Sequence, residues 1–582
     1  MLLMAALAVP IGVAGALVAK ALLWLIAVIT NFVFFGRYSG VLISLQHHRL
    51  GAWVIAVPVA GALIIGFMAR YGSEKIRGHG IPEALEAILL GRSLIQPKVA
   101  ILKPVSSAIS IGTGGPFGAE GPIIMTGGAI GSIAAQFFHL TSAERKTLLV
   151  AGAAAGMAAV FATPVAAVLL AVELLLFEWK PRSLIPVVVA ALVASVLRVP
   201  LLGAGPIFPV TPHAPMGIKE LGAACLVGLL VGFGSGLLTT LVYACEDIFK
   251  KIPVHWMWWP AIGALFVGVG GYFDPRVLGV GYELIHGLLR GEILGAALAG
   301  LLIGKAVVWA IALGSGTSGG VLAPLLIIGG ALGALAGQWL PVGDPGLWAM
   351  VGMAAVMGGT MRAPLTGMFF LLELTHDLNA LPGLLCGSAV ALCVTVLLLK
   401  RSILTEKLAR RGQHITCEYS VDPFELIRVG EVMDENIPAA PASMLLREFS
   451  ANLAIDGDTA ISRRQATFLV DGGGLLAGII TRGDVVRAIA RNANEEMTLI
   501  EAGSRDPAVI FPDETLHDVV AKMLKHNVGR FPVVERNAPR KIIGYLGRAG
   551  ILEARQHYHQ GEDVRERALR PERLFRRKPA GA

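Results

Sequence analysis

Long apolar runs follow one another from the first residues to about residue 400, after which the chain becomes polar and charged. Examples are the runs Ala52 to Ala69, Leu221 to Ala244 and Leu385 to Leu399. Several approach or reach the roughly 20 residues that a bilayer-spanning helix needs. Others are short or are interrupted by glycine and proline, so no exact number of spans follows. The pattern predicts a polytopic, all-α membrane domain over residues 1–411, followed by a soluble region.

The membrane domain contains an internal repeat. A shift of 202 residues aligns Lys103 with Lys305, Gly118 with Gly320 and Pro122 with Pro324, and a shift of 200 aligns Pro164 with Pro364 and Glu173 with Glu373. Glycine-rich helices can match by chance, but that bias does not align lysines and prolines. Paired halves with glycine- and proline-interrupted segments commonly build a substrate site from broken helices near the midplane. We therefore expect two related halves, about 1–200 and 201–411.

Three short loops share one physical form, a glycine-rich stretch followed by a proline and then an apolar helix. They consist of Gly78, His79, Gly80, Ile81 and Pro82; of Gly118, Ala119, Glu120, Gly121 and Pro122; and of Gly320, Val321, Leu322, Ala323 and Pro324. Proline suits the first helical turn, and glycine lets the backbone approach a ligand closely. The free N–H groups and the dipole at a helix N-terminus attract an anion. The loops therefore predict an anion pathway whose binding is weak enough to allow release.

Composition narrows the class of function further. Charged residues make up only 15% of the chain, against about a quarter in ordinary soluble proteins. The net charge of +8 does not indicate nucleic acid, because many basic residues follow the last apolar run, which places that end in the cytoplasm by the positive-inside rule. The apolar segments contain no HExxH motif, Walker loop or Ser/His/Asp arrangement. We expect neither enzymatic activity nor a metal site.

Four phrases in the chain, GHGIP, GAEGP, SGTSGGVLAP and MRAPLTGMFFLLELTHD, resemble the signature segments of the CLC family of chloride channels and chloride/proton antiporters, in the family's order. The resemblance implies a homodimer with one pore per subunit, halves of inverted topology and chloride as the ligand. It also implies that Glu120 gates the pore, by occupying an anion site when ionised and leaving it when protonated. Independently, a carboxylate in apolar membrane sequence suggests function. The structural alternative is that Glu120 only stabilises the helix N-terminus.

The chain departs from the family pattern around the central anion site. His79 stands where the family commonly has serine, Leu322 where it has phenylalanine, and an ungapped alignment puts Lys400 at the inner tyrosine. His79 could donate a hydrogen bond to the anion and make conduction depend on pH. Alternatively, His79 points elsewhere and the Gly80 and Ile81 amides bind the anion. The sequence leaves both alternatives open.

The inner proton position of the family's antiporters is occupied here by Leu174, which cannot carry a proton. Its neighbour Glu173 could substitute, but the repeat partner Glu373 favours a structural role shared by both halves. For Lys103 and Lys305, snorkelling or a structural ion pair is favoured over anion binding. The leading hypothesis is therefore a gated chloride channel. The alternative is a proton-coupled chloride or fluoride antiporter.

The soluble region resembles a pair of CBS domains through phrases such as ATFLVDGGGLLAGIITRGDVVRAIA. We expect a linker over 412–429, CBS domains over 430–493 and 494–560, and a basic tail over 561–582. Thr481 and Asp484 keep the spacing that holds a ribose in the family, so an adenine nucleotide is one candidate ligand, although no cofactor is required. An N-cap by Thr481 explains part of the same pattern. The expected location is the plasma (inner) membrane, with the CBS pair in the cytoplasm.

Overall fold

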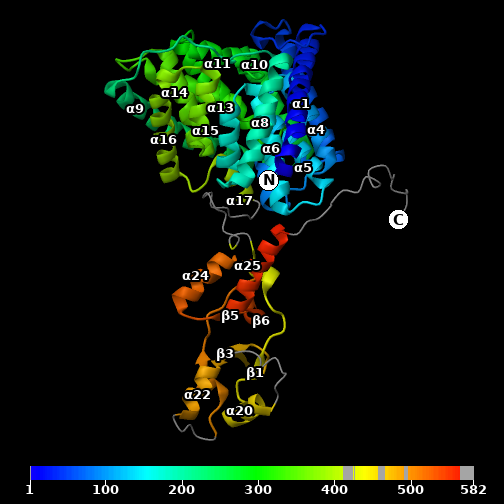
Figure 1. The fold of residues 1–582 in the computed structure, drawn as a ribbon, viewed down its shortest axis with the longest axis vertical. Coiled ribbons are helices and arrows are strands. Elements are labelled where there is room, and N and C mark those ends of the chain that lie inside the picture. Colours follow the sequence, from blue (N-terminus) through cyan, green and yellow to red (C-terminus); the bar gives the residue numbers. More distant parts are fainter. Residues whose placement is uncertain (1, 411–423, 425–426, 456–465, 491–495, 564–582) are drawn as a thin grey trace, which may run out of the picture. The chain divides into compact units, whose positions relative to one another are not determined.

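The computed structural model describes residues 2–410, 424, 427–455, 466–490 and 496–563 (Figure 1). The chain divides into two compact units, one up to residue 412 and the other over 413–563. Each unit is described by itself. The predicted linker 412–429 lies largely outside the described residues, as does the predicted tail 561–582.

The first unit is built almost entirely from helices, and each helix of the first half has a counterpart in the second. The first half contains α1 (Leu2–Phe35), α2 (Ala56–Tyr71), α3 (Ile81–Leu89), α4 (Pro97–Gly112), α5 (Glu120–Gln136), α6 (Ser142–Phe161), α7 (Pro164–Leu170) and α8 (Pro181–Leu202). The second half contains α9 (Ile218–Lys251), α10 (Trp259–Phe273), α11 (Tyr282–Leu289), α12 (Gly295–Gly314), α13 (Leu322–Gly337), α14 (Pro345–Val356), α15 (Pro364–Thr375) and α16 (Leu381–Leu398), and α17 (Ile403–Arg410) follows. The internal repeat of the sequence is thus a repeat of helices.

Glycine contacts hold equivalent helix pairs together in the two halves. Between α5 and α6, a Cβ atom on Gly127 would lie 2.2 Å from the Gly152 carbonyl oxygen. Between α13 and α14, a Cβ on Gly329 would lie 2.6 Å from the Gly352 carbonyl oxygen. Small residues let the backbones of membrane helices approach closely, and packing then supplies the stability that hydrophobic burial cannot supply in lipid. The two close crossings fix the positions of α5 and α13. The N-termini of these two helices are the points at which two of the glycine loops end.

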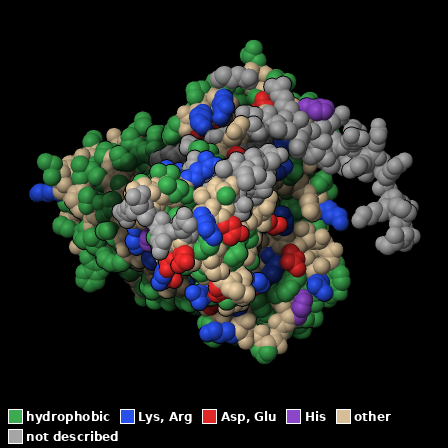
Figure 2. Space-filling model, turned by 90° about the horizontal axis from the view of Figure 1, so that it is seen from below, with side chains coloured by type: hydrophobic (Ala, Val, Ile, Leu, Met, Phe, Trp, Pro, Cys, Tyr) green, Lys and Arg blue, Asp and Glu red, His purple; other side chains and the backbone are tan. Residues whose placement is uncertain are grey.

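Six segments of this unit, among the residues described, are long and apolar enough to cross a membrane. Large hydrophobic side chains remain exposed on several of their helices, for example Leu226, Phe233 and Leu237 on α9. Figure 2 shows hydrophobic side chains gathered over a flank of the molecule with few charged ones among them. An apolar surface of this extent requires lipid or a partner to cover it. The predicted polytopic all-α membrane domain is confirmed.

The second unit is an α/β structure with two sheets. A sheet of order β1-β2-β3-β4 contains one parallel pair, β1 with β2, and β5 pairs with β6 antiparallel. The strands are β1 (Ala439–Pro441), β2 (Ala466–Val470), β3 (Leu476–Thr481), β4 (Ser504–Arg505), β5 (Arg530–Glu535) and β6 (Ala538–Gly547). The helices are α19 (Val429–Val432), α20 (Leu446–Ile455), α22 (Arg482–Ala490), α23 (Leu499–Ala502), α24 (Leu516–His526) and α25 (Arg548–Asp563). Phe468 and Tyr545 pack together, with ring centroids 5.9 Å apart, and join the two halves of the unit.

Candidate anion pathway and gate

The three glycine loops predicted from the sequence meet in the structure. Gly118 and Gly320 exchange backbone hydrogen bonds of 3.1 Å and 2.9 Å, so the loops before α5 and α13 lie side by side. The Gly78 amide donates to the Thr317 carbonyl at 3.1 Å, which attaches the loop before α3 to the same place. The N-termini of α3, α5 and α13 therefore converge, two from the first half of the repeat and one from the second. Such a convergence provides oriented N–H dipoles for an anion.

Glu120 lies at this convergence and is completely buried. Its carboxylate lies over two glycines: a Cβ on Gly118 would be 1.8 Å from one carboxylate oxygen, and a Cβ on Gly320 would be 2.7 Å from the same oxygen. The backbone amides of Glu120 and Ala323, at the starts of α5 and α13, stabilise the negative charge of the carboxylate electrostatically. Neither oxygen reaches hydrogen-bond geometry with any residue that the structure describes. The side chain thus lies at the N-termini of both helices, where the N–H dipoles favour a negative charge.

The loop before α3 differs from the other two in the carboxylate that its backbone amide binds. The Gly80 amide donates to the Glu83 carboxylate at 2.8 Å, so this amide is engaged by its own helix. A Cβ on Gly121 would lie 1.8 Å from the His79 carbonyl oxygen, which shows how closely α3 approaches α5. The His79 ring is buried, and its Nδ1 has no hydrogen-bond partner among the described residues. In the alternative in which the Gly80 and Ile81 amides bind the anion, the Gly80 amide becomes available only if Glu83 moves.

His79 also lines a cavity of about 630 Å³. Its lining carries charges of both signs and consists of Glu74, Lys75, Arg77, Gly78, His79, Glu83, Glu86, Val242, Tyr243, Glu246, Lys250, Trp259, Leu313, Gly314, Gly316, Ile403, Lys407 and Arg410. The Lys407 ammonium of α17 contacts the Glu83 carboxylate at 2.6 Å. A Cβ on Gly78 would lie 2.2 Å from the same ammonium nitrogen. A positive charge therefore borders the loop that contains His79.

Lys407, Glu83 and Tyr243 were not identified as site residues from the sequence. Lys400, the residue placed at the inner tyrosine by ungapped alignment, is exposed and is not among the residues that line this cavity. Its position in the pathway is not supported. The Tyr243 hydroxyl, which comes from α9, instead reaches the cavity and donates to the Ile403 carbonyl at 2.5 Å. A tyrosine contributed by a different helix leaves no signal in a local motif.

The remaining candidate positions lie within the packed interior. Three of them are at most 1% exposed: Ile81 and Leu322, which begin α3 and α13, and Val321, which directly precedes α13. Pro82 is also buried, in the first turn of α3. Leu174 is 5% exposed and belongs to a short π-helical segment after α7. It is not among the residues that line the cavity.

Lys103 and Lys305 are completely buried and occupy equivalent places in the two halves. The Lys103 ammonium donates to the carbonyls of Ile76 and Gly78 at 2.8 Å and 2.7 Å. The Lys305 ammonium donates to the carbonyls of Val277 and Gly279 at 3.0 Å and 3.1 Å. The sequence favoured snorkelling or a structural ion pair over anion binding. Both charges instead point into the protein, where they donate to backbone carbonyls and hold the loops that precede α3 and α11.

Glu173 and Glu373 cap helices across the repeat. The Glu173 carboxylate accepts from the amides of Leu365 and Thr366, at 3.2 Å and 2.8 Å, and from the Thr366 hydroxyl at 2.6 Å. The Glu373 carboxylate accepts from the amides of Val165 and Ala166, at 3.0 Å and 2.8 Å. Each glutamate thus neutralises the N-terminus of the helix equivalent to its own in the other half, α15 and α7 respectively. This geometry supports the structural hypothesis for Glu173.

In the second unit, Thr481 and Asp484 contact each other. The Thr481 hydroxyl and amide donate to the Asp484 carboxylate at 2.6 Å and 2.8 Å, and Arg487 also contacts this carboxylate. Burial alone would raise the pKa of Asp484, but the hydrogen bonds from Thr481 and the charge of Arg487 lower it below its ordinary value. The pair forms a capping interaction at the start of α22. A ribose would have to compete with these contacts.

The unit consists of two related halves of apolar helices, and helix N-termini from both halves meet at the buried Glu120 carboxylate. This arrangement defines an integral membrane protein suited to transporting an anion. The chain belongs to the voltage-gated chloride channel (CLC) family, whose family model matches residues 61–396. The model of the CBS domain matches twice, at residues 429–491 and 500–557. Both predicted resemblances are confirmed.

Individual relatives agree with this assignment. The H(+)/Cl(-) exchange transporter ClcA of Vibrio vulnificus (strain YJ016) is 28% identical over 390 residues, which cover 62% of this chain and 83% of the relative. The protein of the same name from Vibrio campbellii is 30% identical over 377 residues, covering 62% and 80%. The structure of a slow cyanobacterial Cl-/H+ antiporter superposes with a TM-score of 0.63 at 22% identity, covering 70% of this chain and 97% of that one. The last similarity shows the fold.

Proposed function

We propose that this protein is a proton-coupled chloride antiporter in which Glu120 both gates the anion pathway and carries the proton. Relatives named as H(+)/Cl(-) exchange transporters support this function. They favour the alternative of the sequence analysis over its leading hypothesis of a passive channel. The anion is chloride in this proposal, and fluoride is the second candidate because His79 stands where the family pattern commonly has serine.

The observation that carries the proposal is the position of Glu120. Its carboxylate lies within van der Waals reach of Gly118 and Gly320, at the N-termini of α5 and α13. A carboxylate and a chloride ion compete for such a place, because both gain the same N–H dipoles. Protonation removes the charge that holds the side chain there. One residue can therefore exchange a proton for an anion at a single site.

The inner half of the proton path has to differ from the usual one. Leu174 occupies the usual proton position, and the Glu173 carboxylate is engaged by α15. The cavity beside His79 provides another route for the proton, because it carries Glu83, Glu86 and Tyr243 and is large enough to contain water. Because position 174 is a leucine, proton–chloride exchange by this route requires water in the cavity to carry the proton.

The test is a flux assay with purified protein in liposomes. A chloride gradient is imposed, and chloride efflux and external pH are recorded together, with and without a potassium shunt. We expect chloride to drive protons uphill in the wild type. Glu120→Ala should abolish proton movement, while chloride flux persists because the competing carboxylate is gone. Glu292→Gln, at an exposed surface position, is the matched control.

Chloride efflux that requires the shunt and moves no protons would refute the antiporter and restore the channel. An unchanged Glu120→Ala variant would refute the role of Glu120 itself. Absence of chloride flux in the wild type would direct the same assay to fluoride.

Three further parts of the proposal concern assembly and location. The exposed apolar faces of helices such as α9 are consistent with a homodimer in a bilayer. Arg401, Lys407 and Arg410 around α17 favour a cytoplasmic position for that end, in the plasma (inner) membrane. The CBS pair would then lie in the cytoplasm as a regulatory module, and nucleotide binding by Thr481 and Asp484 stays a prediction.

A further inference from the structure

A second buried polar group lies close to the gate. Tyr282 begins α11, and its hydroxyl is buried with no hydrogen-bond partner among the described residues. The two carboxylate oxygens of Glu120 are in the same condition. The charge of Glu120 acts electrostatically on this hydroxyl. Two buried groups of complementary chemistry, which this charge couples, thus both lack a partner among the described residues.

Aromatic rings surround the tyrosine. Its ring packs edge-on against Phe161, with centroids 6.3 Å apart, and against Phe208 at 6.0 Å. These contacts fix the ring, and neither aromatic ring offers the hydroxyl a hydrogen-bond partner. A buried hydroxyl without a partner costs about 1–3 kcal/mol. In a native protein such a group calls for an explanation, and a partner that is present in another state of the protein provides one.

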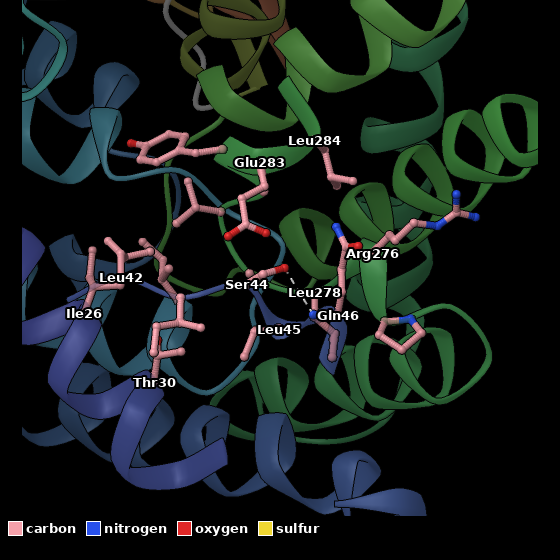
Figure 3. A pocket seen from close by; sticks show the side chains of 17 residues that line it. Ile26, Thr30, Leu42, Ser44, Leu45, Gln46, Arg276, Leu278, Glu283 and Leu284 are labelled. Carbon is pink, nitrogen blue, oxygen red and sulfur yellow. Dashed lines mark hydrogen bonds between the residues drawn. The ribbon is translucent and has the colours of Figure 1, made fainter. Parts of the chain in front are cut away.

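Tyr282 also lines a pocket that is separate from the cavity beside His79. The pocket has a volume of about 240 Å³, and its polar lining residues include Ser44, Gln46 and Glu283. Figure 3 shows Glu283 pointing into this pocket, near Ser44. In Figure 1, α10 and α11 lie at the end of the membrane unit opposite α17. Tyr282 therefore lines a pocket at the end of the membrane unit opposite the Lys407 cavity.

We propose that the Tyr282 hydroxyl receives the Glu120 carboxyl group when that side chain leaves the anion site. Tyrosine can accept a hydrogen bond from the protonated acid and donate one to either form of the carboxyl. It would stabilise the open position of the gate and hold the proton beside the pocket lined by Glu283, where exchange with water follows. Tyr282 is a positioning residue in this scheme. The inference rests on the proposed role of Glu120.

The test is a double-mutant cycle in the same liposome assay, with Tyr282→Phe, Glu120→Ala and the double variant. Phenylalanine keeps the ring contacts and removes only the hydroxyl. We expect Tyr282→Phe to lower chloride flux about three- to tenfold at neutral pH, as loss of one such hydrogen bond implies. The midpoint of the pH profile should move toward acid by about 0.5–1 unit, because more protonation is needed to open the gate. In the Glu120→Ala background the same substitution should change nothing.

The control is Tyr272→Phe on α10, which removes a hydroxyl from a half-exposed tyrosine and should behave as wild type. A wild-type pH profile for Tyr282→Phe would overturn the inference. An equal loss of flux with and without Glu120 would also overturn it, since that result would indicate a structural role. An unchanged Glu120→Ala variant would instead refute the proposed function on which the inference rests.

Discussion

The reciprocal caps of Glu173 and Glu373 allow the structural role of Glu173 to be separated from a role in proton transfer. The perturbation is Glu173→Gln, compared with Glu373→Gln at the equivalent place in the other half. Both variants keep the length and shape of the side chain. Both replace one carboxylate oxygen with an amide NH₂, which cannot accept the hydrogen bond that a backbone N–H donates.

The magnitude follows from the contacts. Each carboxylate accepts two backbone N–H groups, and the Thr366 hydroxyl adds a third donor for Glu173. A hydrogen bond to a charged group contributes about 1.5–3 kcal/mol, and leaving a buried donor unsatisfied costs about 1–3 kcal/mol. The Thr366 hydroxyl can rotate to accept from the new NH₂, which removes the extra cost. We therefore expect each variant to lose about 2 kcal/mol of stability.

The assay combines thermal unfolding in detergent with chloride and proton flux in liposomes. We expect similar falls in the unfolding temperature for Glu173→Gln and Glu373→Gln, and an unchanged ratio of protons to chloride in both. The exposed Glu292→Gln variant is the control for stability. Loss of proton transport in Glu173→Gln alone would refute the reasoning and make Glu173 a proton relay. Unaltered unfolding temperatures in both variants would refute the capping role.

Two more expectations concern buried or partly buried charges. Lys407→Met should reduce chloride flux at least about fivefold, because it leaves Glu83, whose side chain is 4% exposed, as an uncompensated negative charge beside the pathway. Lys407→Met with Glu83→Gln should recover most of the flux, and no recovery would contradict the electrostatic explanation. Hydrogen bonds with Asp344 and then Asp377 raise the pKa of His213, in the loop between α8 and α9, above its ordinary value of 6.5. The stability that this cluster contributes is complete below the ordinary pKa of histidine and is lost as pH rises through the raised pKa of His213. We therefore expect His213→Gln to lower the unfolding temperature more at about pH 5 than at about pH 8. A pH-independent difference would contradict it.

The sequence could predict those parts of the site that depend on local backbone chemistry. Glycines before a helix and proline in its first turn predicted the N-termini at Glu120 and Leu322, because a single loop carries the whole signal. The repeat also predicted which residues would be equivalent. Partners far apart in the chain could not be predicted in the same way. Glu83 and Lys407 are separated by 324 positions, and neither carries a mark of the other.

The buried lysines show a second limit of the sequence. Lys103 and Lys305 were recognised as a pair, but their partners are backbone carbonyls, which every residue possesses. The ungapped alignment placed Lys400 at the inner tyrosine, whereas Lys400 is exposed and a hydroxyl beside the cavity comes from Tyr243 on α9. A contact to a backbone carbonyl leaves no pattern in the local sequence. A side chain contributed by a distant helix leaves none either.

The hydrogen bonds between the two halves bear on how the pathway opens. Gly118 with Gly320, Glu173 with the start of α15, and Glu373 with the start of α7 all cross from one half to the other. Rocking one half against the other, as in many repeat-built transporters, would break these bonds together inside an apolar interior, where each is expensive to lose. A swing of the Glu120 side chain breaks none of them. The inference that the gate is one side chain predicts that Glu173→Gln and Glu373→Gln weaken the fold without accelerating transport, whereas rocking halves would move faster once these caps were loosened.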